Sequence, residues 1–221
     1  GRVLEQGGVV ADDGTFQELG LPQVVDYCQA ERTILECQAQ HNPAATIVLL
    51  DQPIIVKIVE GQRPGPSSGL PTWTGQGDLK FVLSAGQDDF PRVVLAPGDT
   101  EECFWQTIQA FNLAEKYQLP VIILVDKYLC ESHESVGPFD ESRAKIDRGL
   151  LVKDFLPDYK RYQLTSNGVS PRAFPGQFGL TFSTSSYEHD ELGLAREEAE
   201  NRKSMMEKRA KKTQFLQKEL P

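Results

Sequence analysis

A polar loop with one arginine offers the clearest chemistry in this sequence. Gln62 and Arg63 begin this loop, and four hydroxyl side chains follow them, those of Ser67, Ser68, Thr72 and Thr74. A guanidinium can hold a carboxylate through two parallel hydrogen bonds, and hydroxyls can complete such a pocket. The sequence therefore predicts a site for an organic anion, with Arg63, Ser67, Ser68 and Thr72 as candidate ligands. The alternative is an ordinary connecting loop with a solvated arginine, because most loops rich in Gly and Pro only connect elements.

The residues around this loop predict where it lies. The β-branched run 54–59 comes directly before it and is typical of a buried strand. Prolines at 64, 66 and 71 restrict the backbone, which lowers the entropy lost when the loop is ordered. In an open α/β sheet, ligands bind beyond the carboxyl ends of the strands, where this loop would begin. Lys57 is unexpected in a strand buried on both faces, so the strand has either a wetter face or a lysine directed along the sheet edge.

A strand, a helix and a second strand are predicted further along the chain. Residues 92–95 and 121–125 are compact apolar runs, and residues 100–117 between them have helical periodicity. Asp99 and Glu102 have the spacing of a capping box at the start of that helix. Strands joined in this way are parallel, so we predict the α/β class, with a parallel sheet and flanking helices.

Asp126 and Lys127 follow the second of these strands. If that strand neighbours the one before Arg63, the two side chains line the same crevice as Arg63. The alternative is a surface ion pair, which would contribute at most about 1 kcal/mol to stability.

Composition and the positions of glycine and proline divide the chain into four parts. Residues 1–45 have no assigned role, although residues 22–39 are a helix candidate, and residues 46–130 form a partial α/β domain. Residues 131–191 are polar and irregular, which predicts an extended arm that serves as a functional wrap or a partner contact. Residues 192–221 are predicted to form one charged helix that packs on another subunit or domain through a thin apolar stripe. The stripe consists of Leu194, Met205, Phe215 and Leu216.

The overall composition excludes several classes of protein. The formal net charge of -9 argues against nucleic-acid binding, which needs a basic surface. No apolar run approaches the roughly 18 residues of a membrane span, and residues 1–11 do not resemble a signal peptide, so we expect a cytoplasmic protein. Four cysteines without a Cys-x-x-Cys pair predict no metal or iron–sulfur site in this chain. The chain begins with Gly1 and its only methionines are Met205 and Met206, so we expect a fragment.

Residues 62–72 and 76–79 carry a resemblance to a known family. They read Gln-Arg-Pro-Gly-Pro-Ser-Ser-Gly-Leu-Pro-Thr and Gln-Gly-Asp-Leu. They resemble the signature of the alpha subunit of 2-oxoacid:ferredoxin oxidoreductases, the 2-oxoglutarate type in particular. The resemblance extends from about Pro53 to about Lys212, through residues 90–99, 110–118, 126–129, 168–173, 188–191 and 205–209. It implies the thiamine diphosphate-binding fold, with residues 46–130 as part of the pyrimidine-side domain.

The resemblance also implies a reaction and its cofactors. Enzymes of this family oxidatively decarboxylate a 2-oxoacid to an acyl-CoA and pass the electrons to ferredoxin. Thiamine diphosphate and Mg would be shared with a beta subunit, an iron–sulfur cluster would lie in a partner subunit, and this chain alone would hold none of them. Arg63 matches the family's arginine for the substrate carboxylate. Gly75 departs from the family, which usually has an acidic residue there, and the departure puts the downstream anchoring of the loop in question.

Several alternatives stay open at the level of sequence. Among substrates, 2-oxoglutarate is favoured, with pyruvate and branched-chain oxoacids as alternatives. The family's cofactor-activating glutamate is not recognisable here, so we expect the chain alone to be inactive. Two alternatives to an oxidoreductase alpha subunit stay open. The chain is either an inactive fragment or binding module that keeps only the subunit-contact surface, or a related transketolase-type enzyme without ferredoxin.

Overall fold

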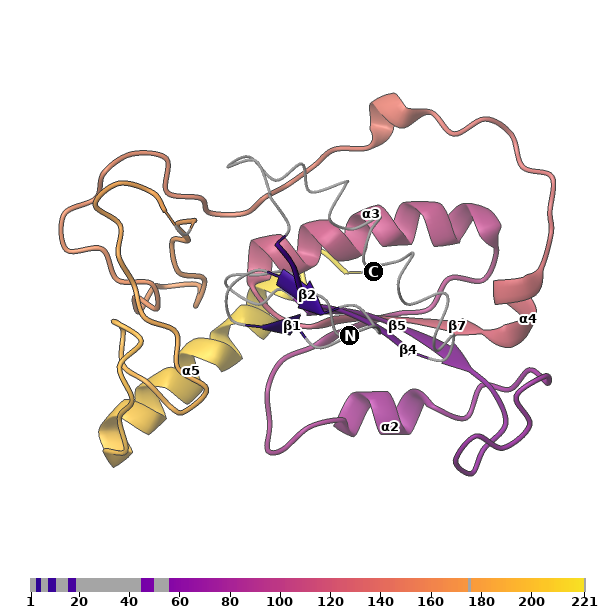
Figure 1. The fold of residues 1–221 in the computed structure, drawn as a ribbon, viewed down its shortest axis with the longest axis horizontal. Coiled ribbons are helices and arrows are strands. Elements are labelled where there is room, and N and C mark those ends of the chain that lie inside the picture. The colour runs from indigo at the N-terminus through magenta and orange to yellow at the C-terminus, as the bar shows by residue number, and fades with distance from the viewer. Residues whose placement is uncertain are drawn as a thin grey trace. The chain divides into compact units, whose positions relative to one another are not determined.

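The computed structural model describes residues 3–4, 8–10, 16–18, 45–49, 56–174 and 176–220 (Figure 1). The chain divides into two compact units, Gly1–Asn42 and Pro43–Pro221. In the first unit, three short antiparallel strands form a sheet: β1 (Val3–Leu4), β2 (Gly8–Val10) and β3 (Phe16–Glu18). The helix predicted at residues 22–39 lies outside the described residues.

The second unit is built on a four-stranded sheet. Its strands are β4 (Ala45–Leu49), β5 (Val56–Gln62), β6 (Val93–Leu95) and β7 (Val121–Asp126), in the order β4-β5-β7-β6. Both β5 and β6 pair with β7 in parallel, which confirms the predicted α/β class. At the edge, β4 pairs with β5 in antiparallel orientation, which the sequence did not predict. The connection between these two strands is too short for a parallel crossover, which needs about a dozen residues or more.

Helices cover both faces of this sheet. The alternating side chains of β7 divide between two clusters: Val121, Ile123 and Val125 pack with helix α3 (Thr100–Tyr117), while Ile122 and Leu124 pack with Val82 of helix α2 (Leu79–Ser84). The two helices accordingly lie on opposite sides of the strands (Figure 1). A one-turn helix, α4 (Lys127–Glu131), follows β7 directly. The central strand is therefore buried on both faces, as expected for a parallel sheet.

Helix α3 begins as its sequence predicts. The carboxylate of Asp99 accepts a hydrogen bond from the backbone N–H of Glu102 at 2.8 Å. In return, the carboxylate of Glu102 accepts one from the N–H of Gly98 at 2.7 Å. Two backbone donors that the helix itself cannot satisfy are thus paired by side chains.

Lys57 of β5 is buried, with 7% of its surface exposed. Its ammonium group lies 3.1 Å from the centroid of the Phe111 ring on α3. The lysine therefore packs between the sheet and α3, where a cation over an aromatic face is attracted electrostatically. The predicted direction along the sheet edge is therefore wrong. The strand does have a wetter position, because Val59, two residues further on the same face, is 42% exposed, but Lys57 itself is covered.

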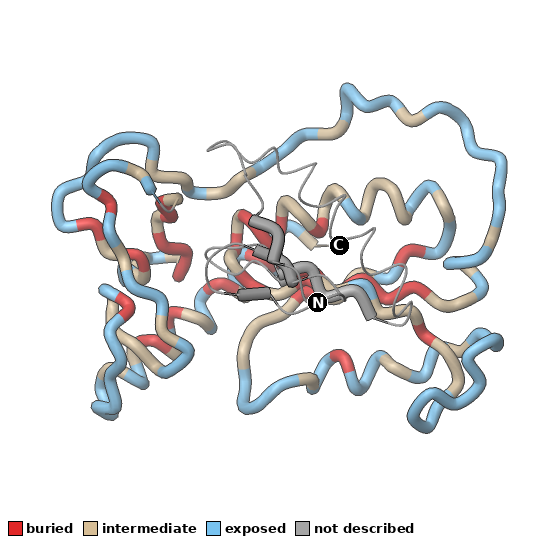
Figure 2. The backbone as a smooth tube through the Cα atoms, viewed as in Figure 1, coloured by how far each residue is buried: buried red, intermediate tan, exposed pale blue. Residues whose placement is uncertain are grey.

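Residues 131–191, the predicted arm, contain little regular structure. The described elements are one 3-10 turn (Glu141–Arg143) and two isolated bridges. The arm is nevertheless fastened to α3: Phe139 stacks on Phe104 at a centroid distance of 4.1 Å, and Asn112 bonds to the backbone of Lys145 and Asp147. In Figure 2 its first part is largely exposed, whereas buried positions return further along it. The limits of the arm at residues 130 and 191 stay predictions.

The C-terminal helix α5 spans Ala199–Leu216, which is shorter than the predicted 192–221. A turn occupies the preceding residues, because Gly193 has a φ of +86° and Asp190 accepts hydrogen bonds from the N–H groups of Leu192 and Leu194. Of the predicted apolar stripe, Met205 and Leu216 are buried, and Leu216 packs in the cluster that contains α3. The other two stripe residues, Leu194 and Phe215, are exposed. No helix within the described ranges has the length and hydrophobicity needed to cross a membrane.

Candidate functional site

The loop that carries Arg63 leaves the carboxyl end of β5. Gln62, the last residue of that strand, is 5% exposed and pairs in register with Asp126, the last residue of β7. Arg63 is half-buried at the base of the loop, and the loop projects beyond the sheet beside α4 (Figures 1 and 2). The predicted location at the carboxyl edge of a parallel sheet is therefore confirmed.

The loop folds back on its own first residues. The N–H of Leu70 donates to the carbonyl of Pro64 at 3.0 Å, and the N–H of Gly69 donates to the carbonyl of Pro66 at 3.1 Å. Gly69 has a φ of +45°, and a Cβ atom there would lie 1.8 Å from the carbonyl oxygen of Pro64. No larger residue fits this backbone at position 69.

Gly75 also lies close to the start of the loop. A Cβ atom at this position would lie 2.9 Å from the nitrogen of Pro64 and 3.1 Å from the proline ring. The acidic residue that the resemblance leads one to expect at position 75 would therefore crowd Pro64. Glycine at this position lets the two ends of the loop pack together.

The far end of the loop is anchored by β7 and α4. The side-chain amide of Gln76 donates to Asp126 Oδ2 at 2.7 Å, and the N–H of Tyr128 donates to the Thr74 hydroxyl at 3.3 Å. Asp126 Oδ1 accepts from the N–H of Leu129 at 2.9 Å and so caps α4. Hydrogen bonds from the Leu129 backbone and from Gln76 lower the pKa of Asp126. The anchoring that the sequence left in question is thus supplied by Thr74 and Gln76.

The two interpretations of Asp126 and Lys127 can now be distinguished. Asp126 lies at the same edge as the Arg63 loop and binds it, whereas Lys127 forms an ion pair with Glu131 one turn along α4. The surface ion pair between Asp126 and Lys127 is therefore wrong. Asp126 reaches the Arg63 loop because β5 and β7 are neighbouring strands, and this pairing could not be predicted from the sequence alone.

Charges near the base of the loop act on one another. Burial raises the pKa of Glu60 on β5, the charge of Asp78 raises it further, and the guanidinium of Arg63 opposes both effects. In the part of the chain that the structure describes, Arg63 makes no hydrogen bond or ion pair. Its five donors are therefore available to a ligand.

The other three predicted ligands lie on the outer part of the loop. Ser67, Ser68 and Thr72 are exposed, and Ser67 has a φ of 57°. No contact within the described ranges joins any of their hydroxyls to Arg63. The four residues share one ordered loop, but a closed pocket around them needs a wall from outside this loop.

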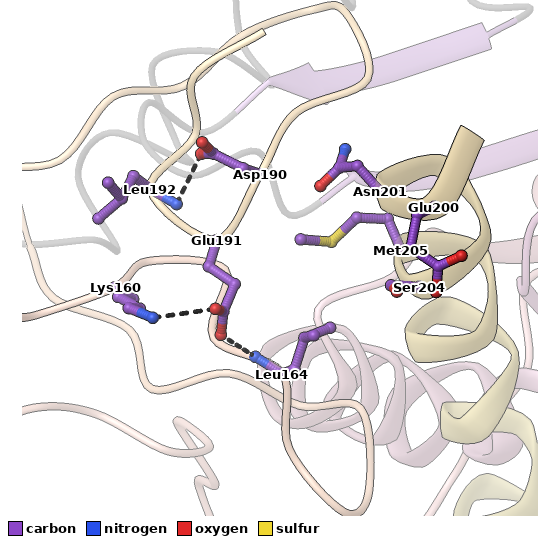
Figure 3. A pocket seen from close by; sticks show the side chains of 9 residues that line it. All are labelled: Lys160, Leu164, Asp190, Glu191, Leu192, Glu200, Asn201, Ser204 and Met205. Carbon is purple, nitrogen blue, oxygen red and sulfur yellow. Dashed lines mark hydrogen bonds and ion pairs between the residues drawn. The ribbon is translucent and has the colours of Figure 1, made fainter. Parts of the chain in front are cut away.

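Two surface cavities lie elsewhere in the molecule. The first, of about 300 Å³, is shown in Figure 3 and is lined by the arm and α5. Two of its acidic groups are already paired: Glu191 binds Lys160 at 2.9 Å and the N–H of Leu164 at 2.8 Å, and Asp190 binds the N–H of Leu192 (Figure 3). The third acidic residue that lines the cavity is Glu200. These side chains fix the fold of the arm and leave few groups for a ligand.

The second cavity, of about 230 Å³, is lined in part by an ion-pair network. Arg202 and Arg209 of α5 bind the carboxylate of Glu188 at 2.6 and 2.7 Å. Burial acts to raise the pKa of Glu188, but the hydrogen bonds and charges of the two arginines lower it to about 2. A perturbed pKa in such a network reflects a structural ion pair. Across the described residues, no group of three or more His, Cys, Asp or Glu side chains could hold a metal ion.

Sequence reasoning missed the residues that hold the loop in place. Gln76 and Thr74 lie within or beside the Gln-Gly-Asp-Leu motif, but their binding partners are far away in sequence. The only local signal was the position of Asp126 directly after an apolar strand.

Comparisons with known proteins agree with this geometry. Residues 47–208 match the model of the pyruvate flavodoxin/ferredoxin oxidoreductase family, thiamine diphosphate-binding domain. The chain belongs to this family. The family consists of oxidoreductase enzymes, so the resemblance recognised from residues 62–72 is confirmed.

Similar proteins share part of their length with this member of the family. The chain is 46% identical over 162 residues to subunit alpha of 2-oxoacid:ferredoxin oxidoreductase 1 from Sulfurisphaera tokodaii, covering 72% of this chain and 25% of that protein. It is 32% identical over 138 residues to the KorA subunit of 2-oxoglutarate synthase from Methanothermobacter thermautotrophicus, covering 62% of this chain and 35% of that one. The chain thus spans about a quarter of the length of the first of these relatives.

A solved structure shares the fold. The 2-oxoglutarate:ferredoxin oxidoreductase from Magnetococcus marinus, solved with 2-oxoglutarate, coenzyme A and succinyl-CoA bound, matches with a TM-score of 0.71 and 35% identity. The match covers 75% of this chain and 29% of that chain. The predicted thiamine diphosphate-binding fold is confirmed by this neighbour and by the family match.

Proposed function

We propose that this chain is the pyrimidine-side part of the alpha subunit of a 2-oxoacid:ferredoxin oxidoreductase. The complete enzyme would convert a 2-oxoacid and coenzyme A to an acyl-CoA and pass the electrons to ferredoxin. One observation carries the proposal: an ordered loop at the carboxyl edge of the parallel sheet presents an arginine without a protein partner among the described residues. The names of the similar subunits support the reaction class.

In this proposal Arg63 binds the carboxylate of the oxoacid. A 2-oxoacid is an anion, and its decarboxylation requires the carboxylate to be held in one orientation while the bond to carbon breaks. A guanidinium fork supplies both the opposite charge and the direction. The exposed hydroxyls of Ser67, Ser68 and Thr72 would complete the pocket once another part of the enzyme closes over the loop.

Thiamine diphosphate would supply the electron sink for decarboxylation. The described residues of this chain do not fit that cofactor on their own, because the loop offers a guanidinium and hydroxyls and no acidic cluster suits a metal ion for a diphosphate. We therefore assign thiamine diphosphate and Mg to a site shared with a beta subunit, and the iron–sulfur cluster to a partner subunit.

Among substrates, 2-oxoglutarate is favoured. The name of the Methanothermobacter relative and the ligands of the Magnetococcus structure support this choice, with pyruvate and branched-chain oxoacids as alternatives. A beta subunit would be the direct partner, and ferredoxin and coenzyme A would be reached through the complex. We place the complex in the cytoplasm.

A second candidate function is an inactive fragment or binding module that keeps only the subunit-contact surface. The observation in its favour is that the described residues alone do not fit the cofactor. Oxoacid-dependent reduction of a viologen dye, with thiamine diphosphate, Mg and coenzyme A, separates the two functions. The proposal expects reduction when the alpha subunit carrying this sequence is mixed with its beta subunit, and none from either alone. Absence of reduction with all three oxoacid types in the mixture would favour the module.

A further inference from the structure

We propose that Asp126 is a positioning residue of the oxoacid site, which sets the orientation of Arg63 by holding the far end of its loop through Gln76. This inference rests on the proposed function of Arg63. The residue that binds the substrate would thus directly follow β5, and the residue that orients it would be the last residue of β7.

The loop begins and ends beside the same point of the sheet. It leaves β5 after Gln62, and the register of the parallel strands places Asp126 of β7 directly opposite Gln62. The chain then returns, and Gln76 binds Asp126 Oδ2 at 2.7 Å. Both ends of the segment that carries Arg63 are therefore fixed to neighbouring strand ends, one by the covalent chain and one by a hydrogen bond.

The Asp126 carboxylate uses its two oxygens for two different elements. While Oδ2 holds the loop, Oδ1 accepts from the N–H of Leu129 and caps α4. The hydroxyl of Thr74 also accepts a hydrogen bond from the N–H of Tyr128 in the first turn of α4. A carboxylate fixed by the helix it caps is a rigid anchor, because it cannot rotate away without leaving a backbone donor unpaired.

A continuous line of contacts connects this anchor to Arg63. Gln76 adjoins Gly75, whose backbone lies so close to Pro64 that an added Cβ atom would approach its nitrogen to 2.9 Å. Pro64 is in turn held from the other side by the N–H of Leu70 at 3.0 Å and is bonded to Arg63. Displacement of residues 74–76 would therefore shift Pro64 and, with it, the backbone that carries the guanidinium.

The charge of the anchor makes a decisive test possible. Asp126 accepts hydrogen bonds in its ionised form, so Gln76→Glu would place two carboxylates in contact and push the loop away from β7. Adding Asp126→Asn to that variant restores one donor and one acceptor with the direction of the hydrogen bond reversed. Asparagine also remains a good N-cap, so α4 is preserved.

The experiment measures KM and kcat separately for the oxoacid in the complete complex. We expect Gln76→Glu to raise KM about tenfold or more, since a hydrogen bond to a charged group is lost and repulsion is added, while kcat changes by less than about threefold. The double variant Gln76→Glu/Asp126→Asn should recover most of that loss. Glu131→Gln, which breaks the exposed ion pair on the same helix, is the matched control and should leave KM unchanged.

Arg63→Ala decides between failure of this inference and failure of the proposed function. If Asp126 acts through Arg63, Gln76→Glu should add no further increase in KM to that of Arg63→Ala. Full additivity of the two changes, or an unchanged KM in Gln76→Glu alongside a raised KM in Arg63→Ala, would overturn the positioning role alone. An unchanged KM in Arg63→Ala would overturn the proposed function. If Gln76→Glu does not fold, Thr74→Val/Gln76→Ala detaches the same contacts without new charge and carries the same expectations.

Discussion

Arg172 of the arm and Glu115 of α3 form an ion pair in which both side chains are almost fully buried. The two residues are 57 positions apart in sequence, so the pair joins the arm to the middle of the domain. Arg148 adds a second, longer contact to the same carboxylate at 3.8 Å. Buried ions of this kind are costly to separate, because the partner that remains has no water to replace the lost charge.

The first prediction concerns this pair. Glu115→Gln should lower the free energy of unfolding by about 3–5 kcal/mol, since it leaves the Arg172 guanidinium buried without its counter-charge. The double variant Glu115→Leu/Arg172→Met should lose much less, because apolar side chains of similar volume remove both charges. Denaturant unfolding measures both changes. Equal losses in the single and double variants would mean that packing, and not charge, connects the arm to α3.

The second prediction concerns pH. Lys208 and Lys212 of α5 are each 7% exposed, and Lys212 donates to the carbonyl of Gln118 at 2.9 Å. Burial, together with Arg161 and Arg209, lowers the pKa of Lys208 to about 8. Burial and the neighbouring Lys208, Arg161 and Arg209 lower the pKa of Lys212 to about 7. Glu191 is the acid that partly offsets these charges at Lys208.

Because these folded-state pKa values lie below those of unfolded lysine, the unfolded chain binds more protons between about pH 7 and pH 10. The free energy of unfolding should therefore rise with pH across this window, and the buried charges should destabilise the fold most below pH 7. Lys212→Met should raise stability by on the order of 2 kcal/mol at pH 6.5 and should change it little at pH 10. Chemical unfolding at the two pH values measures the difference, and an equal effect at both would contradict the assignment. Lys211→Met, at an exposed neighbouring position, is the control.

The third prediction compares two glycines of the loop. Gly69→Ala should destabilise the loop, because its φ is +45° and a methyl group would collide with the carbonyl of Pro64. Gly77→Ala should be tolerated, because no atom lies within 4 Å of its Cβ position. We expect a loss of about 1–3 kcal/mol in the first variant and little change in the second. Thermal unfolding and oxoacid KM are the measurements, and a Gly77→Ala effect as large as that of Gly69→Ala would show that the loop tolerates neither.

The fourth prediction tests the charge on the loop. Arg63→Ala in the assembled enzyme should raise the oxoacid KM and lower kcat/KM by on the order of 10²-fold, because a charge-assisted pair and its orienting effect are lost together. Arg63→Lys should lose less, since it keeps the charge and gives up only the fork. Lys80→Ala removes an exposed positive charge from neighbouring α2 and should leave kcat/KM unchanged. Steady-state viologen reduction reports all three values, and an unaltered kcat/KM in Arg63→Ala would remove this residue from the substrate site.

Local signals made part of the fold predictable. The capping residue Asp99 and the apolar periodicity of residues 100–117 act within one helix, so the sequence contains all the information they need. The antiparallel pairing of β4, the cation–π contact of Lys57 and the burial of Lys208 and Lys212 depend on distant neighbours. A lysine in a charged helix gives no sign of which face will be covered.

In the candidate site, too, features set by local sequence were predictable and contacts between distant residues were not. The composition of residues 62–72 predicted an ordered loop at a strand end, because prolines and glycines limit the conformations of such a loop, and Arg63 made it a candidate for binding an anion. Its anchor was not predictable, since Gln76 and Asp126 are 50 residues apart and meet only after β5 and β7 have paired.

The last residues of the chain lie against the middle of the domain, and this has a consequence for biosynthesis. Leu216 packs in the same cluster as Val121 and Ile123 of β7, and Glu219 accepts a hydrogen bond from the hydroxyl of Tyr117 at 2.7 Å. During translation, the strands of the sheet and α3 emerge from the ribosome well before α5 is synthesised. During that interval the apolar face that Leu216 later covers is open, and such faces bind to one another or to chaperones. The nascent chain can therefore close its core only after α5 has emerged, so a stall in translation within the arm would leave an aggregation-prone intermediate.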